Sequence, residues 1–115
     1  GEQTQIEARD YATLELDLIA VKGKEEAVRI FSLVGDRGKL DDPAFRTLVV
    51  RHEEMLHSYR AQQWQRARLS LTECRRLDDN GEFEVLHGLY EERIAAYEVD
   101  PPAADWDGVF VATSK

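Results

Sequence analysis

The sequence predicts an α+β fold in which one β-hairpin is followed by a three-helix, antiparallel tail. Two runs with strand character lie near the start of the chain, a polar turn containing a glycine joins them, and apolar residues recur at helical spacing from residue 45 onward. With 115 residues, 43% of them apolar, the chain suits one small folded unit. We expect residues 1–35 to carry the hairpin, 36–43 to form a linker and 44–115 to form the helical tail.

The predicted hairpin covers residues 14–34. Its second strand, 27–34, is rich in β-branched and aromatic side chains, as strands prefer. The turn at 22–26 is polar, and Gly23 can adopt a positive φ there. In the first strand the apolar side chains alternate onto one face and the acidic ones onto the other. The apolar set is Leu14, Leu16, Leu18 and Ala20, and the acidic residues Glu15 and Asp17 share their face with Ile19 and Val21.

The helical tail is predicted from spacing and from start and stop signals. Asp41 or Asp42 can cap the first helix, Pro43 suits its first turn, and Gly81 follows the second helix. Apolar residues then recur every three or four positions along three segments. The three stripes are Phe45, Leu48, Val49, His52, Met55, Leu56 and Tyr59; Trp64, Ala67, Leu71, Cys74 and Leu77; and Phe83, Leu86, Leu89, Tyr90, Ile94 and Tyr97.

The second helix of the tail resembles that of a tetratricopeptide-like helical hairpin in its pattern of small and large side chains. Trp64 is followed by Ala67, Leu71 and Cys74. Only about one and a half repeats fit in the tail, so a stacked solenoid is not expected. The last stretch, 105–111, is apolar enough that we expect it to dock onto the rest of the fold.

Composition excludes several classes of function. The net charge of -8 repels phosphate backbones and anionic lipid headgroups, so we expect no nucleic-acid binding and no direct membrane contact. No stretch approaches the roughly 20 apolar residues of a membrane span. The single cysteine, Cys74, cannot form an intramolecular disulfide, which fits a reducing compartment.

The segment 14–35 resembles the closing hairpin of class III adenylate and guanylate cyclase catalytic domains. The matching residues are Glu15-Leu16-Asp17, Val21-Lys22-Gly23-Lys24 and Val28-Arg29-Ile30-Phe31. Further on, His52-Glu53-Glu54-Met55-Leu56, Tyr59-Arg60, Pro101-Pro102 and Asp105-Trp106-Asp107-Gly108-Val109 look like the tails of bacterial, membrane-anchored cyclases that carry a sensor domain.

The resemblance implies that this chain is the C-terminal end of a longer enzyme that converts ATP or GTP to a cyclic nucleotide and pyrophosphate. In that family the first lysine of the turn, here Lys22, points at the nucleotide triphosphate. An ammonium group there stabilises the charge that grows on the leaving pyrophosphate. The family's metal-binding aspartates, for Mg²⁺ or Mn²⁺, lie upstream. We therefore assign no catalytic or metal-binding residue to this chain, expect no metal bound to it, and expect it to be inactive alone.

The resemblance also implies a place on the cytoplasmic side of the inner membrane and a homodimeric parent enzyme. An isolated hairpin is marginal in water, so its apolar residues should pack onto the tail or pair with another copy through the open strand edges, giving a strand-paired oligomer. The competing hypothesis is a helical regulatory module that binds a protein partner through the groove between its helices and has no share in catalysis.

Other candidate sites have plainer interpretations. His52 and His57 are five residues apart, which does not fit the four-residue spacing of a zinc protease helix. Cys74 is predicted to be a small buried side chain rather than a redox group. The basic cluster of Arg66, Arg68, Arg75 and Arg76 is predicted to pair with nearby acids on a solvated helix face.

Overall fold

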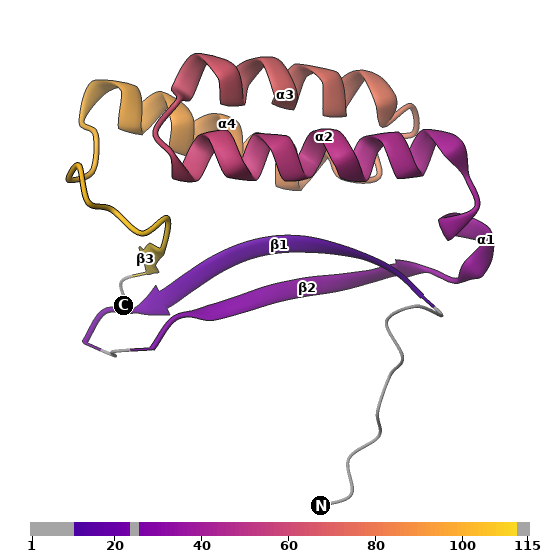
Figure 1. Cartoon of the computed structure of the whole chain (residues 1–115), viewed down its shortest axis with the longest axis horizontal. Coiled ribbons are helices and arrows are strands. Elements are labelled where there is room, and N and C mark those ends of the chain that lie inside the picture. Colours follow the sequence, from indigo (N-terminus) through magenta and orange to yellow (C-terminus); the bar gives the residue numbers. More distant parts are fainter. Residues whose placement is uncertain (1–10, 24–25, 113–115) are drawn as a thin grey trace, which may run out of the picture.

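The chain folds into two layers, a small sheet and a layer of helices that covers one face of it (Figure 1). The computed structural model describes residues 11–23 and 26–112. In chain order the elements are β1 (Ala12–Val21), β2 (Val28–Gly35), α1 (Arg37–Leu40), α2 (Pro43–Arg60), α3 (Trp64–Leu77), α4 (Glu84–Val99) and β3 (Phe110–Ala112).

The predicted α+β class, the hairpin and the three long helices are confirmed. Asp42 caps α2 by accepting a hydrogen bond from the Ala44 amide, with Pro43 in the first turn. The chain leaves α3 through a turn in which Gly81 has a φ of 68°. The segment predicted to be a linker, 36–43, contains the one-turn helix α1, which buries none of its residues.

The sheet has three strands in the order β2-β1-β3, so the expectation of a hairpin alone was incomplete. Strands β1 and β2 are antiparallel, whereas β3 pairs in parallel with the end of β1. A strand of three residues carries too little alternation to be recognised in sequence. The expectation that 105–111 docks onto the fold is confirmed.

A β-bulge at Leu16 changes which side chains of β1 face the helices. Glu15 pairs with Phe31 and Asp17 pairs with Ile30, so Leu16 is one extra residue on β1. Directly paired residues lie on the same face of the sheet. A one-residue shift moves every later side chain of the strand to the opposite face. The predicted single face for the four apolar residues is therefore wrong. Beyond the bulge, Asp17 and Ile19 face the helices, and Leu18 lies on the outer face with its partner Arg29.

The core has two clusters of buried side chains, one between the two layers and one within the helical layer. One contains Leu14, which is 2% exposed, with Phe45 and Leu48 of α2 and Phe83 before α4. The other lies between α2, α3 and α4 around Tyr59, which contacts the rings of Trp64, Tyr90 and Trp106. The first cluster covers only the inner face of the hairpin. On its outer face Phe31 is 56% exposed and Leu33 is 53% exposed.

Candidate functional site

The lysine singled out by the resemblance lies on the exposed turn that follows β1. Lys22 is exposed, and within the described part of the chain no ion pair involves its ammonium group. Gly23 has a φ of 91°, a conformation that side chains rarely adopt, and it lets the chain reverse direction directly after the lysine. The sequence-based placement of Lys22 on a hairpin turn is therefore confirmed. Its role toward phosphate remains a prediction.

The backbone of this turn is held by β3. The Lys22 amide donates a hydrogen bond of 2.9 Å to the carbonyl oxygen of Ala112. The register between β1 and β2 ends at the pair of Ile19 and Val28, whereas β3 pairs with Ile19, Ala20 and Val21. Among the described residues, the last two positions of β1 and the lysine are thus held through β3 rather than through β2.

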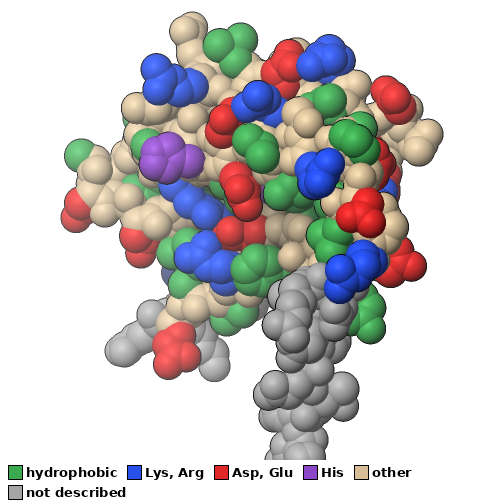
Figure 2. Space-filling view, turned by 45° about the vertical axis from the view of Figure 1, so that its right-hand side comes forward, with side chains coloured by type: hydrophobic (Ala, Val, Ile, Leu, Met, Phe, Trp, Pro, Cys, Tyr) green, Lys and Arg blue, Asp and Glu red, His purple; other side chains and the backbone are tan. Residues whose placement is uncertain are grey.

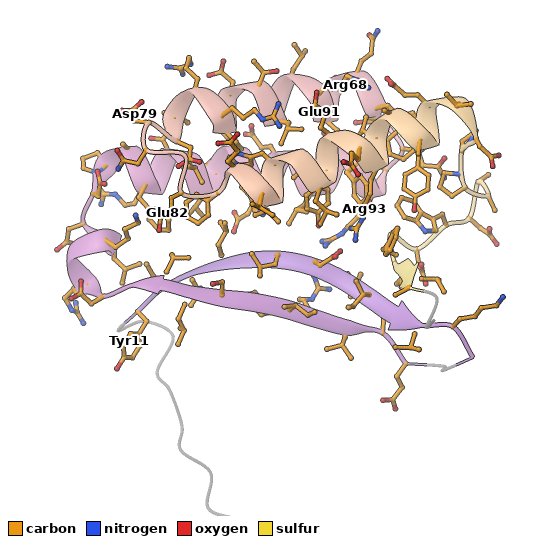
Figure 3. The ribbon with its side chains drawn as sticks, turned by 180° about the vertical axis from the view of Figure 1, so that it is seen from behind. Tyr11, Arg68, Asp79, Glu82, Glu91 and Arg93 are labelled. Carbon is orange, nitrogen blue, oxygen red and sulfur yellow. The ribbon has the colours of Figure 1, made fainter. Side chains whose placement is uncertain are left out.

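An ion pair fixes β1 to α4 next to this turn. Arg93 donates two hydrogen bonds of 2.8 Å to the two carboxylate oxygens of Asp17. Burial would raise the pKa of Asp17, but the hydrogen bonds and the charge of Arg93 outweigh burial and lower it. Figure 3 shows Arg93 projecting from α4 toward the sheet. The Arg93 guanidinium also lies over the ring of Phe110, 3.7 Å from its centroid, so this side chain joins α4 to both β1 and β3.

The bulge supplies backbone acceptors that the helices use. The Tyr90 hydroxyl donates a 2.6 Å hydrogen bond to the carbonyl oxygen of Leu16, the extra residue of β1. His52 Nε2 lies 2.7 Å from the carbonyl oxygen of Glu15. Since a carbonyl can only accept, this nitrogen carries the ring proton. A bulge leaves backbone groups outside the ladder, and buried groups of that kind need partners, which α2 and α4 provide.

The Glu15 carboxylate links both layers. It accepts hydrogen bonds of 2.8 Å from Arg29 on β2 and from Arg60 at the end of α2. Gly108 packs against Arg60, with a φ of 86° and only 2.6 Å between the position of an added Cβ and the Arg60 Cγ. The chain therefore passes close to α2 just before it enters β3, and only glycine fits there without displacing Arg60.

The described part of the hairpin does not offer a metal site. Glu15 and Asp17, the two carboxylates of β1, are both engaged by arginines, and Glu26 of the turn is exposed. Within residues 11–23 and 26–112, no group of three or more His, Cys, Asp or Glu side chains could hold a metal ion. The described residues thus do not fit the Mg²⁺ or Mn²⁺ that the cyclase resemblance implies for the parent enzyme.

The histidines lie apart from the turn. His57 is exposed, as its position on the helix predicted, whereas His52 is fully buried rather than partly buried as its position suggested. His87 is 1% exposed, and neither of its ring nitrogens has a hydrogen-bond partner among the described residues. The Asp78 carboxylate lies 4.0 Å from its Nδ1. Burial lowers the pKa of both His52 and His87.

The remaining candidates have structural roles. Cys74 is buried on α3, and burial raises its pKa to about 12, so it is a neutral thiol. Three members of the basic cluster pair with acids as predicted: Arg68 with Glu98, Arg75 with Glu91, and Arg76 with Glu73. Figure 2 shows basic and acidic side chains intermixed rather than gathered into a basic patch on the face that it displays.

An apolar groove separates the free edge of β2 from α4. It has a volume of about 470 Å³ and lies between Ile30 and Ser32 of the sheet and Val85, Leu86 and Leu89 of α4. A second hollow of about 420 Å³ lies between α2 and α3 and is lined largely by polar side chains, including Glu53, His57 and Arg66. Sequence reasoning did not find the apolar groove, because its walls come from elements more than 50 residues apart.

Comparison with known proteins gave no match to a protein-family model, to a curated protein or to a solved structure. In the described part of the chain, no helix combines the length and the apolar character needed to cross a bilayer. The fold and the turn define a two-layer α+β unit with helices on one face of a small sheet.

Proposed function

We propose that this chain is the C-terminal part of a class III nucleotidyl cyclase that converts ATP or GTP to the 3′,5′-cyclic nucleotide and pyrophosphate in signal transduction. Lys22 faces the triphosphate of the nucleotide bound to the complete enzyme. As the ribose 3′-oxygen attacks the α-phosphorus, negative charge grows on the departing pyrophosphate. A lysine ammonium is a compact point charge that stabilises it without needing a fixed bidentate geometry.

The observation that supports the proposal is that one face and one edge of the hairpin are left uncovered by the described residues. Its inner face is packed by the tail, but its outer face exposes Phe31 and Leu33, each more than half exposed, and no described strand pairs with the free edge of β2. Exposed apolar faces and unpaired edges are normally covered. A larger catalytic sheet would cover both and leave the Lys22 turn at its rim.

In this proposal the tail is a brace. The contacts of Arg60, Tyr90 and Arg93 with β1 all converge on residues 15–17, directly before the segment that ends at Lys22. Metal ions of the enzyme, Mg²⁺ or Mn²⁺, would be held by carboxylates outside this chain. The tetratricopeptide-like character of the tail is likewise a proposal, supported by the packing of Ala67 and Leu71 into the cluster that joins α3 to α2.

The test uses the complete protein from which this chain derives. Purified enzyme with ATP or GTP should yield cyclic nucleotide and pyrophosphate, and Lys22→Ala should lower kcat/KM about 100-fold, as removal of one charge-stabilising donor does in other enzymes. Arg66→Ala is the control, because it removes an exposed cation from α3 rather than from the turn. Absence of cyclic nucleotide from either substrate, or equal effects of the two variants, would overturn the proposal. The 115-residue chain alone should be inactive.

A second candidate, a non-catalytic module that binds a protein partner, is favoured by the apolar groove between β2 and α4. A partner segment inserted there would cover Val85, which is 89% exposed, and Leu89. Deleting residues 41–115 from the complete protein separates the two candidates. Lost catalysis with an intact dimer indicates a brace, whereas unchanged basal activity with a lost partner response indicates a binding module.

A further inference from the structure

We propose that β3 and the residues leading into it position Lys22, so that the last described segment of the chain belongs to the phosphate site although it contains no phosphate-binding side chain. The inference rests on the proposed function, since it concerns the same lysine. Phe110 and Trp106 are its positioning residues. Neither would touch the nucleotide.

The first step of the argument is that the lysine depends on β3 for its backbone position. The hydrogen bond from the Lys22 amide to Ala112 is 2.9 Å long, and β3 pairs with each of the last three residues of β1. Beyond Ile19 the register to β2 has ended. A strand end without a partner frays, and the Lys22 Cα would move with it.

The second step is that β3 is itself anchored to the body of the fold at two points. The Phe110 ring lies under the Arg93 guanidinium, and the same guanidinium holds Asp17 on β1. The Trp106 indole donates a 2.9 Å hydrogen bond to the Val109 carbonyl. Its ring packs on those of Tyr59 and Tyr97 from α2 and α4.

These contacts form a closed path. It runs from β1 through Asp17 and Arg93 to Phe110, then along β3 to Ala112 and back to Lys22, the residue that directly follows β1. A three-residue strand would be weak by itself, so its pairing depends on the Arg93 contact and on the docked indole. Because a displacement of about 1 Å at a positioned group can lower a rate about 100-fold, a loosened strand should reduce catalysis without removing the lysine.

The test compares Phe110→Ala with two matched variants. Phe110→Tyr keeps a ring under Arg93. Val111→Ala truncates the neighbouring apolar side chain of β3, which is 53% exposed and lies on the other face of the strand. The first readout is amide hydrogen exchange of the 115-residue chain, followed residue by residue by NMR.

Phe110→Ala should speed exchange at the Lys22 amide about tenfold while the slowest amides of α2 keep their rates. The Tyr and Val111 variants should leave the Lys22 rate within about twofold of the original. An unchanged Lys22 rate, or acceleration of all amides by the same factor, would overturn the inference, because the latter indicates only a loss of global stability.

The second readout is the kinetics of the complete protein. Phe110→Ala should lower kcat/KM for the nucleotide about tenfold, and Phe110→Tyr should restore it. Suppose that the wild-type protein forms cyclic nucleotide in a Lys22-dependent way, but that Phe110→Ala and Val111→Ala have the same kcat/KM. The positioning role is then refuted, and the proposed function stands. If the wild-type protein forms no cyclic nucleotide, the proposed function fails and the inference fails with it.

Discussion

Asp17 and Arg93 form a bidentate ion pair across the two layers, with both hydrogen bonds at 2.8 Å. The side chains are 14% and 9% exposed, so the pair is nearly removed from water. Asp17 faces the helices because of the bulge one residue before it, and Arg93 lies one turn beyond Tyr90, which bonds the bulge itself. The contact that aligns hairpin and tail therefore depends on one extra residue in β1.

Removing one partner of this pair should be strongly destabilising. Arg93→Met leaves the Asp17 carboxylate buried without its counter-charge, and we expect a loss of about 3 kcal/mol in the free energy of unfolding. Urea unfolding followed by circular dichroism measures it. In the double variant Asp17→Asn with Arg93→Met, much of the loss should be recovered, because no charge is left buried. Arg68→Ala, which breaks the exposed pair with Glu98, should cost less than about 1 kcal/mol. Equal losses for Arg93→Met and Arg68→Ala would contradict this account.

Stability should decrease in mildly acidic solution because of the buried histidines. Burial lowers the pKa of His52 and His87 below the ordinary value of 6.5, so protons bind more readily to the unfolded chain than to the folded one. The free energy of unfolding that the two neutral, buried rings contribute is fully present above pH 6.5 and is lost as the pH falls below it. The lowered pKa of Asp17 acts in a separate, more acidic range, below 3.8.

Urea midpoints measured at pH 7.5 and pH 5.5 check this expectation, and the midpoint should be lower at pH 5.5. Replacing His87 by Leu removes one of the two buried rings and should therefore reduce the difference between the two midpoints. Leucine should be tolerated at this position because neither ring nitrogen of His87 is hydrogen-bonded among the described residues. A midpoint independent of pH in this range would show that the two rings are not titrated by unfolding.

Two glycines should respond to alanine in opposite directions. Gly108→Ala places a Cβ 2.6 Å from the Arg60 side chain at a φ of 86°, and we expect a loss of about 2 kcal/mol. Gly88 lies inside α4, where an added Cβ meets nothing within 4 Å. Gly88→Ala should therefore stabilise the protein by about 0.5 to 1 kcal/mol through its helix propensity. Thermal unfolding of the two variants tests the signs, and a stabilising Gly108→Ala would disprove the close packing.

The 115-residue chain should self-associate through its sheet. The outer face exposes Phe31 and Leu33, and the edge of β2 has no partner among the described residues. Sedimentation velocity at tens of micromolar should show a dimer or larger species, and Phe31→Lys with Leu33→Lys should convert it to a monomer. The matched control is Leu69→Lys with Val99→Lys, two exposed apolar residues on the helices. If the wild-type chain is a monomer under these conditions, the prediction that it pairs through its sheet is wrong.

Local patterns were sufficient to predict the helices. Their apolar stripes, the Asp42 cap and the Gly81 turn are encoded within a few residues of one another, and the structure has each of them. The position of Lys22 on a turn followed from the same kind of local signal. The burial of Cys74 and the pairing of the arginines on α3 also follow from helix phase.

Tertiary structure alone decided the features that shape the candidate site. The bulge at Leu16 depends on how β1 pairs with β2, and it reversed the predicted faces of Asp17 and Leu18. Strand β3 exists because Phe110 and Ala112 meet the end of β1, about 90 residues away along the chain. Sequence periodicity reports which residues share a face within one element. It cannot report which distant backbone will satisfy an unpaired amide, and that pairing is what fixes the turn of Lys22.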